Sequence, residues 1–299
     1  MVNRINKLIT IVTPTYNRAG RLAKLYQSLV EQKEYNFIWM IIDDGSIDNT
    51  YSVASEYIEE DIFPIKYYKK KNGGKHTALN EAIDRTDTEL FFIVDSDDYL
   101  TSNATTTIQG DWKSHCHKNL CGISYLRGYS EEKPIGDLFP QNGMIDYFAE
   151  IRVNRHVRGD KAEVWSTKYL KKFRFPVFQG ERFLVESYLW LQVSKLAPML
   201  FINKIIYVTE YLEGGLTQSG RKLRIACPQG GMSFSLLAMA PEYKYKERLK
   251  NAILWVAYSR FAKQRIWSIL NMPYKWLILS MYPVGLFIYW YWRTKYRDE

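Results

Sequence analysis

The sequence predicts an α/β domain in which helices flank a mostly parallel central sheet. Short apolar, β-branched runs alternate with segments of helical periodicity through residues 8–100. The connections between them are short, as in sheets built from strand–helix–strand units. Three of the apolar runs end in polar groups, TPTYN, DDGS and DSDD. Ligands bind beyond the carboxyl ends of the strands in such sheets, so these groups should meet at one edge.

The strands are predicted from their apolar runs. The clear ones are LITIVTPTYN (8–17), FIWMIIDDGS (37–46) and ELFFIVDSDDYL (89–100), and IKYYKK (65–70) is a shorter candidate. Unpaired carboxylates resist burial, so the last run should divide into two parts. Its apolar half should be a central strand buried on both faces, and its acidic half should emerge at the strand end.

Helices are predicted between these strands from apolar residues at helical spacing. They are AGRLAKLYQSLVEQ (19–32), IDNTYSVASEYIEE (47–60) and, after a Gly-Gly turn, KNGGKHTALNEAIDRT (71–86). Asp48 or Asn49 should cap the second helix, because Asp and Asn are favoured at helix starts.

Three parts of the chain are predicted: 1–112, 113–228 and 229–299. The middle part is less regular, with a helix at 180–196, a strand at 199–211 and a loop, LEGGLTQSGRK, at 212–222. The Gly214-Gly215 pair suits a hinge in that loop. We expect this part to extend the same fold and to enclose a second pocket.

The last part is basic and aromatic. Residues 241–275 hold eight Lys or Arg and two Glu, and residues 276–292 carry no charge. Pro283 and Gly285 interrupt the uncharged run, which is at the lower length limit for a membrane span. A basic amphipathic helix beside Trp and Tyr favours attachment at a membrane surface. The alternative is a helical pair packed on the domain or on another subunit.

The compartment is predicted from cysteine usage and the N-terminus. Three cysteines are too few for a disulfide framework, which fits a reducing environment. The opening MVNRINKLITIV lacks the pattern of a signal peptide. We therefore expect the α/β part at the cytoplasmic face of the cell membrane. The net charge of +9 alone indicates little more than a solvated basic surface.

The cluster Asp95-Ser96-Asp97-Asp98 has the chemistry of a hard-cation site. Mg²⁺ and Mn²⁺ prefer carboxylate oxygens and commonly share their shell with substrate phosphates. The alternative is a turn or helix cap, where Asp is also favoured. The preceding buried strand and the two other polar strand ends favour the functional interpretation.

In this order and spacing, IVTPTYNRAGRL, IIDDGSIDNT, NGGKHTALNEA and FIVDSDD resemble the nucleotide-sugar domain of family 2 glycosyltransferases. The resemblance covers residues 7–112 strongly and reaches about residue 225 more weakly. It implies the Rossmann-like GT-A fold and the type of enzyme that acts in bacterial surface polysaccharide synthesis.

The resemblance also implies roles for individual residues. Pro14 and Tyr16 should contact uracil and ribose, Asp44 should pair with the base, and Lys75 should line the nucleotide site. The implied nucleotide-binding set is Pro14, Tyr16, Asp44, Lys75, Asp95, Ser96 and Arg221 or its neighbour Lys222. Asp97 and Asp98 are the expected ligands of Mn²⁺ or Mg²⁺.

The catalytic base is less clearly marked. The segment GERFLVESYLWLQ resembles a family segment in which a Glu-Asp pair supplies the base, but here Ser187 follows Glu186. Glu186 is the first candidate and Glu181 the second. Glu186 could instead pair with a nearby Arg.

The function expected is a metal-dependent, inverting transfer of a sugar from a UDP-sugar to a lipid-linked glycan. Two alternatives are a sugar nucleotidyltransferase and an inactive nucleotide-sugar or lipid-binding protein. A nucleotidyltransferase usually has a Gly-rich loop after its first strand, and this sequence lacks one there. Only Ser187 favours an inactive binding protein. The expected partners are the donor, the acceptor and a membrane surface. Nucleic acid is not expected, and a homo-oligomer is left open.

Overall fold

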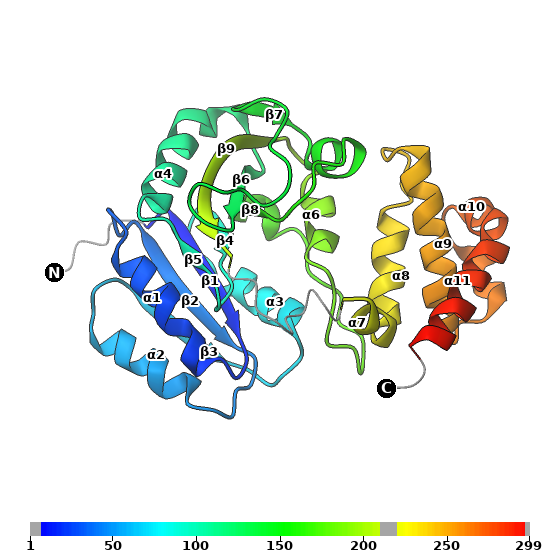
Figure 1. Ribbon diagram of the computed structural model, residues 1–299, viewed down its shortest axis with the longest axis horizontal. Coiled ribbons are helices and arrows are strands. Elements are labelled where there is room, and N and C mark those ends of the chain that lie inside the picture. Colours follow the sequence, from blue (N-terminus) through cyan, green and yellow to red (C-terminus); the bar gives the residue numbers. More distant parts are fainter. Residues whose placement is uncertain (1–6, 210–219, 297–299) are drawn as a thin grey trace.

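The computed structural model describes residues 7–209 and 220–296. It contains an α/β unit around one nine-stranded sheet and a helical bundle at the C-terminal end (Figure 1). The strand order along the sheet is β3-β2-β1-β4-β8-β6-β9-β5, and β7 pairs with β9.

The first four strands form the parallel half of the sheet. They are β1 (Ile9–Thr15), β2 (Phe37–Asp43), β3 (Ile65–Lys69) and β4 (Leu90–Ile93). All the predicted strands of this half are confirmed. Every residue of β4 is buried, so the apolar half of FFIVDSDD is a central strand, as expected.

The second half of the sheet is mixed, so the expectation of a mostly parallel sheet is wrong. The strand β8 runs antiparallel to both β4 and β6, whereas β6 and β9 are parallel. Between β6 and β8 the chain passes through β7 and the short turn η3 and not through an α-helix, so no regular helical crossover imposes parallel pairing there. The strands here are β5 (Tyr99–Leu100), β6 (Gly122–Gly128), β7 (Met144–Asp146), β8 (Lys161–Ser166) and β9 (Met199–Val208).

Helices cover both faces of the sheet and bury two apolar cores. One face packs against α1 (Leu22–Val30), α2 (Thr50–Glu59) and α4 (Ala104–His115). The other packs against α3 (Lys75–Arg85), α5 (Thr167–Leu170) and α6 (Ser187–Val193). Short helical turns lie at η1 (Ala19–Arg21), η2 (Cys116–Lys118) and η3 (Ala149–Asn154). The N-cap residue of α2 is Asn49, and the carboxylate of the preceding Asp48 accepts hydrogen bonds from the backbone N–H and the hydroxyl of Thr50.

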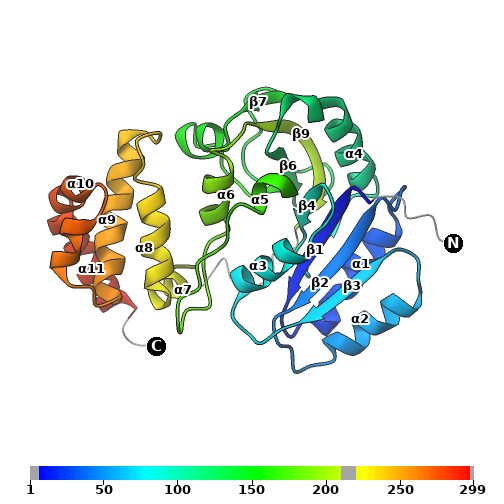
Figure 2. The same cartoon turned by 180° about the vertical axis from the view of Figure 1, so that it is seen from behind.

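The C-terminal helices form a bundle with a core of its own (Figure 2). Its elements are α7 (Gly220–Ala226), α8 (Pro228–Leu237), α9 (Tyr245–Phe261), η4 (Ile266–Asn271), α10 (Lys275–Ser280) and α11 (Tyr282–Lys295). The prediction of an amphipathic helix at the surface is wrong for α9. This helix contacts α8, α10 and α11 and buries Trp255, Val256 and Tyr258, so it is the central helix of the bundle.

The uncharged run at 276–292 is divided between α10 and α11. Pro283 stands in the first turn of α11, where a missing backbone N–H has no cost. Among residues 7–209 and 220–296, no helix has the length and apolar character needed to cross a membrane.

Candidate active site

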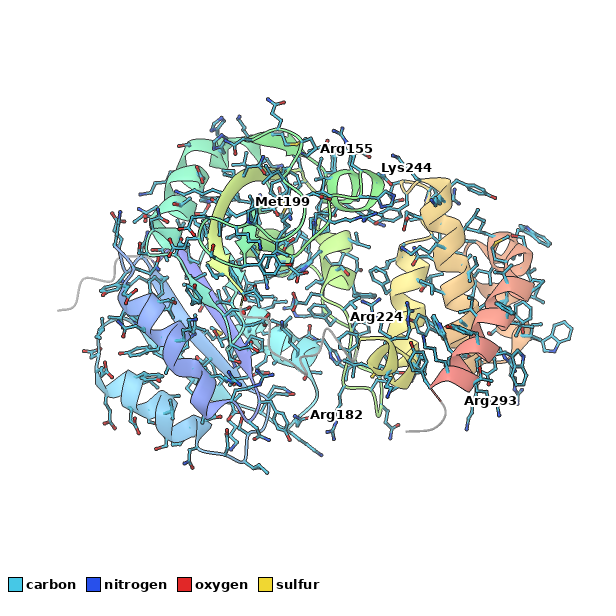
Figure 3. All side chains as sticks on the ribbon, in the orientation of Figure 1. Arg155, Arg182, Met199, Arg224, Lys244 and Arg293 are labelled. Carbon is cyan, nitrogen blue, oxygen red and sulfur yellow. The ribbon has the colours of Figure 1, made fainter. Side chains whose placement is uncertain are left out.

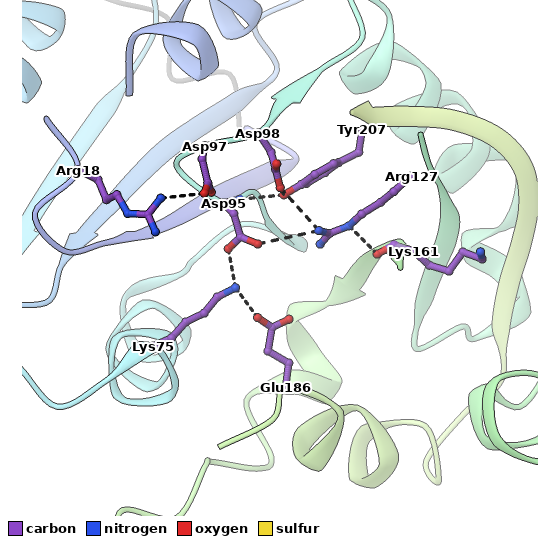
Figure 4. A network of polar contacts seen from close by, with 9 residues as sticks. All are labelled: Arg18, Lys75, Asp95, Asp97, Asp98, Arg127, Lys161, Glu186 and Tyr207. Carbon is purple, nitrogen blue, oxygen red and sulfur yellow. Dashed lines mark hydrogen bonds and ion pairs between the residues drawn. The ribbon is translucent and has the colours of Figure 1, made fainter. Parts of the chain in front are cut away.

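A cluster of charged side chains lies where β4 ends (Figure 4). Its members are the carboxylates Asp95, Asp97, Asp98 and Glu186 and the cations Arg18, Lys75 and Arg127. Four carboxylates face three cations in this cluster. The carboxylates that follow the buried strand are therefore neutralised mainly by basic groups from other elements.

Lys75, the first residue of α3, joins the two halves of the site. Its Nζ lies 2.5 Å from Asp95 Oδ1 and 2.5 Å from Glu186 Oε1. Burial would lower the pKa of Lys75, but Asp95 and Glu186 outweigh it and raise that pKa, so the ammonium stays charged. Burial likewise opposes ionisation of Asp95, yet Lys75 and then Arg127 hold the pKa of Asp95 below its usual range.

Asp97 and Asp98 have different surroundings. Asp97 Oδ2 accepts a 2.8 Å hydrogen bond from the guanidinium of Arg18, which comes from the loop after β1. Asp98 is buried and accepts a 2.6 Å hydrogen bond from the Tyr207 hydroxyl. Burial, followed by the charge of Asp95, raises the pKa of Asp98 to about 7. Asp97 is thus the more accessible of the two.

Arg127 on β6 and Tyr207 on β9 belong to the site, and neither was predicted from the sequence. The guanidinium of Arg127 lies 4.0 Å from the ring centroid of Tyr207, and it is 3.9 Å from Asp95 and 3.8 Å from Asp98. The Tyr207 hydroxyl also accepts a hydrogen bond from the backbone N–H of Asp95. One signal was available for Arg127, since it is a charged residue at the end of the apolar run GISYL.

The predicted base-binding residues lie at the end of β1 and β2. Tyr16 is 45% exposed directly after β1, and Pro14 is half-buried within it. The Asp44 N–H donates to the carbonyl of Thr15, which brings Asp44 beside Tyr16. The free face of Tyr16 is available for stacking with a base. Ser96 is buried in the turn after β4.

Asp44 holds the loop before α3 in place. Its carboxylate accepts hydrogen bonds from Lys70 Nζ and from the backbone N–H groups of Gly73 and Gly74. Its predicted pairing with the base stays a prediction. The contacts seen here explain how the NGG turn is held and how Lys75, which follows it, is positioned.

Gly74→Ala should disrupt this loop. Gly74 has φ +92°, and an added Cβ would overlap the carbonyl oxygen of Arg182. That backbone region is essentially restricted to glycine, so the variant should lose at least about 1–3 kcal/mol of unfolding free energy. Denaturant unfolding measures the loss. Gly110→Ala in α4 is the control, because its Cβ meets open space. If both variants are equally stable, the close approach of this loop to residue 182 is wrong.

The segment before α6 differs from the prediction. A helix was expected over 180–196, but α6 begins at Ser187, and Glu186 immediately precedes it. The Glu181 carboxylate accepts hydrogen bonds from the backbone N–H groups of Gln229 and Gly230 at the start of α8. These tertiary contacts hold the segment in a non-helical conformation. Glu181 therefore caps α8, whereas Glu186 reaches the charged cluster.

Arg221, predicted to meet the diphosphate, lies elsewhere in this structure. Its guanidinium is 4.3 Å from the ring centroid of Trp292 on α11, a cation–π contact that ties α7 to the bundle. The predicted hinge at Gly214-Gly215 lies outside the described residues.

The carboxylates of the cluster could hold Mn²⁺ or Mg²⁺ only if a substrate supplied further ligands. Within 7–209 and 220–296, no group of three or more His, Cys, Asp or Glu could hold a metal ion. Asp97 and Asp98 offer hard oxygens, and one or two carboxylates suffice when phosphate oxygens complete the shell. A bound cation would in turn favour the ionised form of Asp98, whose pKa is raised to about 7 by burial and by Asp95.

Known proteins resemble either part or nearly all of this chain. Residues 10–167 match the family model described as glycosyl transferase family 2. Glycosyltransferase GlyA of Streptococcus pneumoniae is 28% identical over 226 residues, which is 72% of this chain and 32% of that protein. Putative teichuronic acid biosynthesis glycosyltransferase TuaG of Bacillus subtilis is 30% identical over 30% of this chain and 36% of TuaG. The chain spans about a third of the length of each of these two curated relatives.

Solved structures share the fold. TarS 1–349 of S. aureus in complex with UDP-GlcNAc has a TM-score of 0.62 at 16% identity, covering 92% of this chain and 79% of that one. The mannosyltransferase PcManGT of Pyrobaculum calidifontis, in complex with GDP-Man and Mn²⁺, has a TM-score of 0.55 at 16% identity, covering 97% and 88%. These likenesses establish the architecture, and the match over residues 10–167 establishes the family: the chain belongs to glycosyl transferase family 2.

Proposed function

We propose that this protein is a metal-dependent, inverting glycosyltransferase that moves a sugar from a UDP-sugar to a hydroxyl group of a glycan acceptor. One observation carries the proposal. Lys75 contacts both Asp95, in the acidic turn after β4, and Glu186, the candidate base from the second half of the fold. A donor diphosphate and an acceptor hydroxyl would meet at such a junction.

Glu186 is the residue that takes the proton from the acceptor hydroxyl. Its side chain is 29% exposed, so a substrate can reach it, and Lys75 fixes its orientation. Glu181 is excluded from this role in the proposed mechanism, because both of its oxygens cap α8. A single base acting opposite the leaving group implies one displacement, and the anomeric configuration should invert.

The leaving diphosphate gains negative charge as the sugar–phosphate bond breaks. Lys75, Arg18 and Arg127 lie around the carboxylates that face it, and their charges favour the products of bond cleavage. Asp97 and Asp98 would hold Mn²⁺ or Mg²⁺, which when bound supplies Lewis-acid stabilisation of the diphosphate oxygens. Arg18 would then exchange its contact with Asp97 for one with the donor.

The donor and acceptor are proposed from the comparisons and the C-terminal bundle. TarS, which has the same fold, was solved with UDP-GlcNAc, and TuaG is named for teichuronic acid biosynthesis. The first supports a UDP-sugar as the donor, and the second supports a role in making a surface polysaccharide. We propose a polyprenyl-diphosphate-linked acceptor at the cytoplasmic face of the membrane, where the basic bundle would meet anionic groups.

Incubation with UDP-sugars and a membrane lipid extract tests this proposal against its alternatives. A glycosyltransferase yields a lipid-linked product with one added sugar and free UDP, detected by mass spectrometry. A nucleotidyltransferase, supplied with UTP and sugar phosphates, releases pyrophosphate. An inactive binding protein retains the UDP-sugar without turnover. Either of the last two results would overturn the proposal.

A further inference from the structure

The outer side of the C-terminal bundle exposes large apolar side chains from η4, α10 and α11. These elements lie at the end of the molecule farthest from β3 and α2 (Figures 1 and 2). The exposed members of this outer face are Ile266, Trp267, Leu270, Trp276, Val284, Phe287, Trp290 and Tyr291. Trp267 and Trp276 are each 75% exposed and Phe287 is 69% exposed, which is costly for side chains of this size in water.

The exposure is regular along α11. Val284, Phe287 and Tyr291 recur at helical spacing on the side that faces solvent. The opposite side packs inward, with Gly285 against Val256 and Trp292 against Tyr258 of α9. The helix is therefore well packed on one side and still apolar on the other. A helix that is apolar all round is normally covered on both sides.

The charges on this face have one sign. Residues 262–296 contain five Lys or Arg and no Asp or Glu. Three of the cations lie against exposed rings: Lys275 over Trp276, Arg293 over Trp290 and Lys295 over Tyr291 (Figure 3 labels Arg293). Each ring and its cation together present an apolar body and a positive tip. Trp, Tyr and basic residues of this kind gather at the boundary between lipid headgroups and acyl chains.

We propose that the outer face of η4, α10 and α11 docks on an anionic lipid bilayer, with its aromatic rings at the headgroup level and its cations on lipid phosphates. The charge decides between this occupant and a second copy of the chain. Two outer faces brought together would oppose the three ring-bound cations of one copy to the same three of the other, with no acidic residue at 262–296 in either copy to compensate. An anionic bilayer complements both the charge and the apolar surface. This inference rests on the proposed function in one respect: a lipid-linked acceptor would explain why the protein binds a membrane.

Flotation of the full chain with lipid vesicles tests the proposal without any substrate. The protein should float with phosphatidylcholine vesicles that contain phosphatidylglycerol, and much less with phosphatidylcholine alone. The triple variant W267S/W276S/F287S should lower the partition coefficient at least tenfold. The double variant Lys275→Ser/Arg293→Ser should lower binding to the anionic vesicles about thirtyfold at low salt. This factor follows from the usual contribution of each basic residue to the free energy of binding an anionic membrane. The control is Y51S/Y129S/Y147S, which removes exposed rings from the α/β unit and should float like the wild type.

Two results would overturn the proposal. One is a wild-type chain that does not float with anionic vesicles. The other is a wild-type chain that is a dimer by light scattering without lipid, together with a triple variant that is a monomer under the same conditions. UDP release from a UDP-sugar in lipid-free buffer separates this inference from the proposed function, because the triple variant should retain that rate. Circular dichroism and thermal unfolding confirm that the variant folds. If UDP release is absent in the wild type while flotation is normal, only the proposed function fails.

Discussion

Glu186→Gln should lower kcat for sugar transfer by about 10²–10⁴-fold, the usual contribution of a general base. The amide is nearly the same size as the carboxylate but cannot accept a proton from the acceptor hydroxyl. Lys75 keeps Asp95 as its second partner, so the Asp95 turn and the donor site should remain in place. The KM for the UDP-sugar should therefore change little. Steady-state kinetics with saturating donor and varied acceptor measure both quantities.

Glu181→Gln is the matched control for this prediction. It makes the same chemical change five residues earlier, where the carboxylate caps α8. Loss of a charged cap should lower the unfolding free energy by about 0.5–2 kcal/mol and leave kcat near the wild-type value. The reverse pattern, with Glu181→Gln inactive and Glu186→Gln active, would assign the base to Glu181.

Asp97→Asn should lower transfer activity at least about a hundredfold and weaken the dependence on Mn²⁺. Asp97 is the more accessible of the two predicted metal ligands, and its present partner Arg18 is partly exposed and free to exchange. The neutral amide binds a divalent cation poorly and also loses its ion pair with Arg18. Calorimetric titration with Mn²⁺ in the presence of UDP gives a second readout besides activity, and the variant should show much weaker metal binding.

Asp84→Asn provides the control for Asp97→Asn. Asp84 is also paired with an arginine, Arg174, but it lies on α3 outside the charged cluster. Its replacement should change neither Mn²⁺ binding nor turnover. If Asp97→Asn keeps both the wild-type rate and the wild-type Mn²⁺ dependence, the assignment of the metal site to this residue is wrong.

The parallel half of the fold could be predicted because its signals are local. Each strand is a short apolar run, and the carboxyl ends of neighbouring parallel strands meet at one edge of the sheet. This reasoning brought Asp95, Asp97 and Asp98 to that edge, and the structure has them there. Glu186 was also named, but its approach to Lys75 depends on a fold element more than a hundred residues away along the chain.

The rest depends on contacts between distant segments. Arg127 and Tyr207 enter the site through the pairing of β6 with β9, and no local periodicity encodes that pairing. The start of α6 is set by the contact of Glu181 with α8, not by helix propensity. The aromatic residues after position 260 were visible in the sequence, but only the packed bundle separates buried Trp292 from exposed Trp276.

The central claim is tested most directly by UDP release from UDP-sugars with purified protein. With Mn²⁺ present, at least one UDP-sugar should be turned over, a chelator should stop the reaction, and added Mn²⁺ should restore it. Acceptor from a lipid extract should raise the rate, and Glu186→Gln should abolish that increase. A protein that releases no UDP from any UDP-sugar in the presence of Mn²⁺ and acceptor lipids would contradict the account.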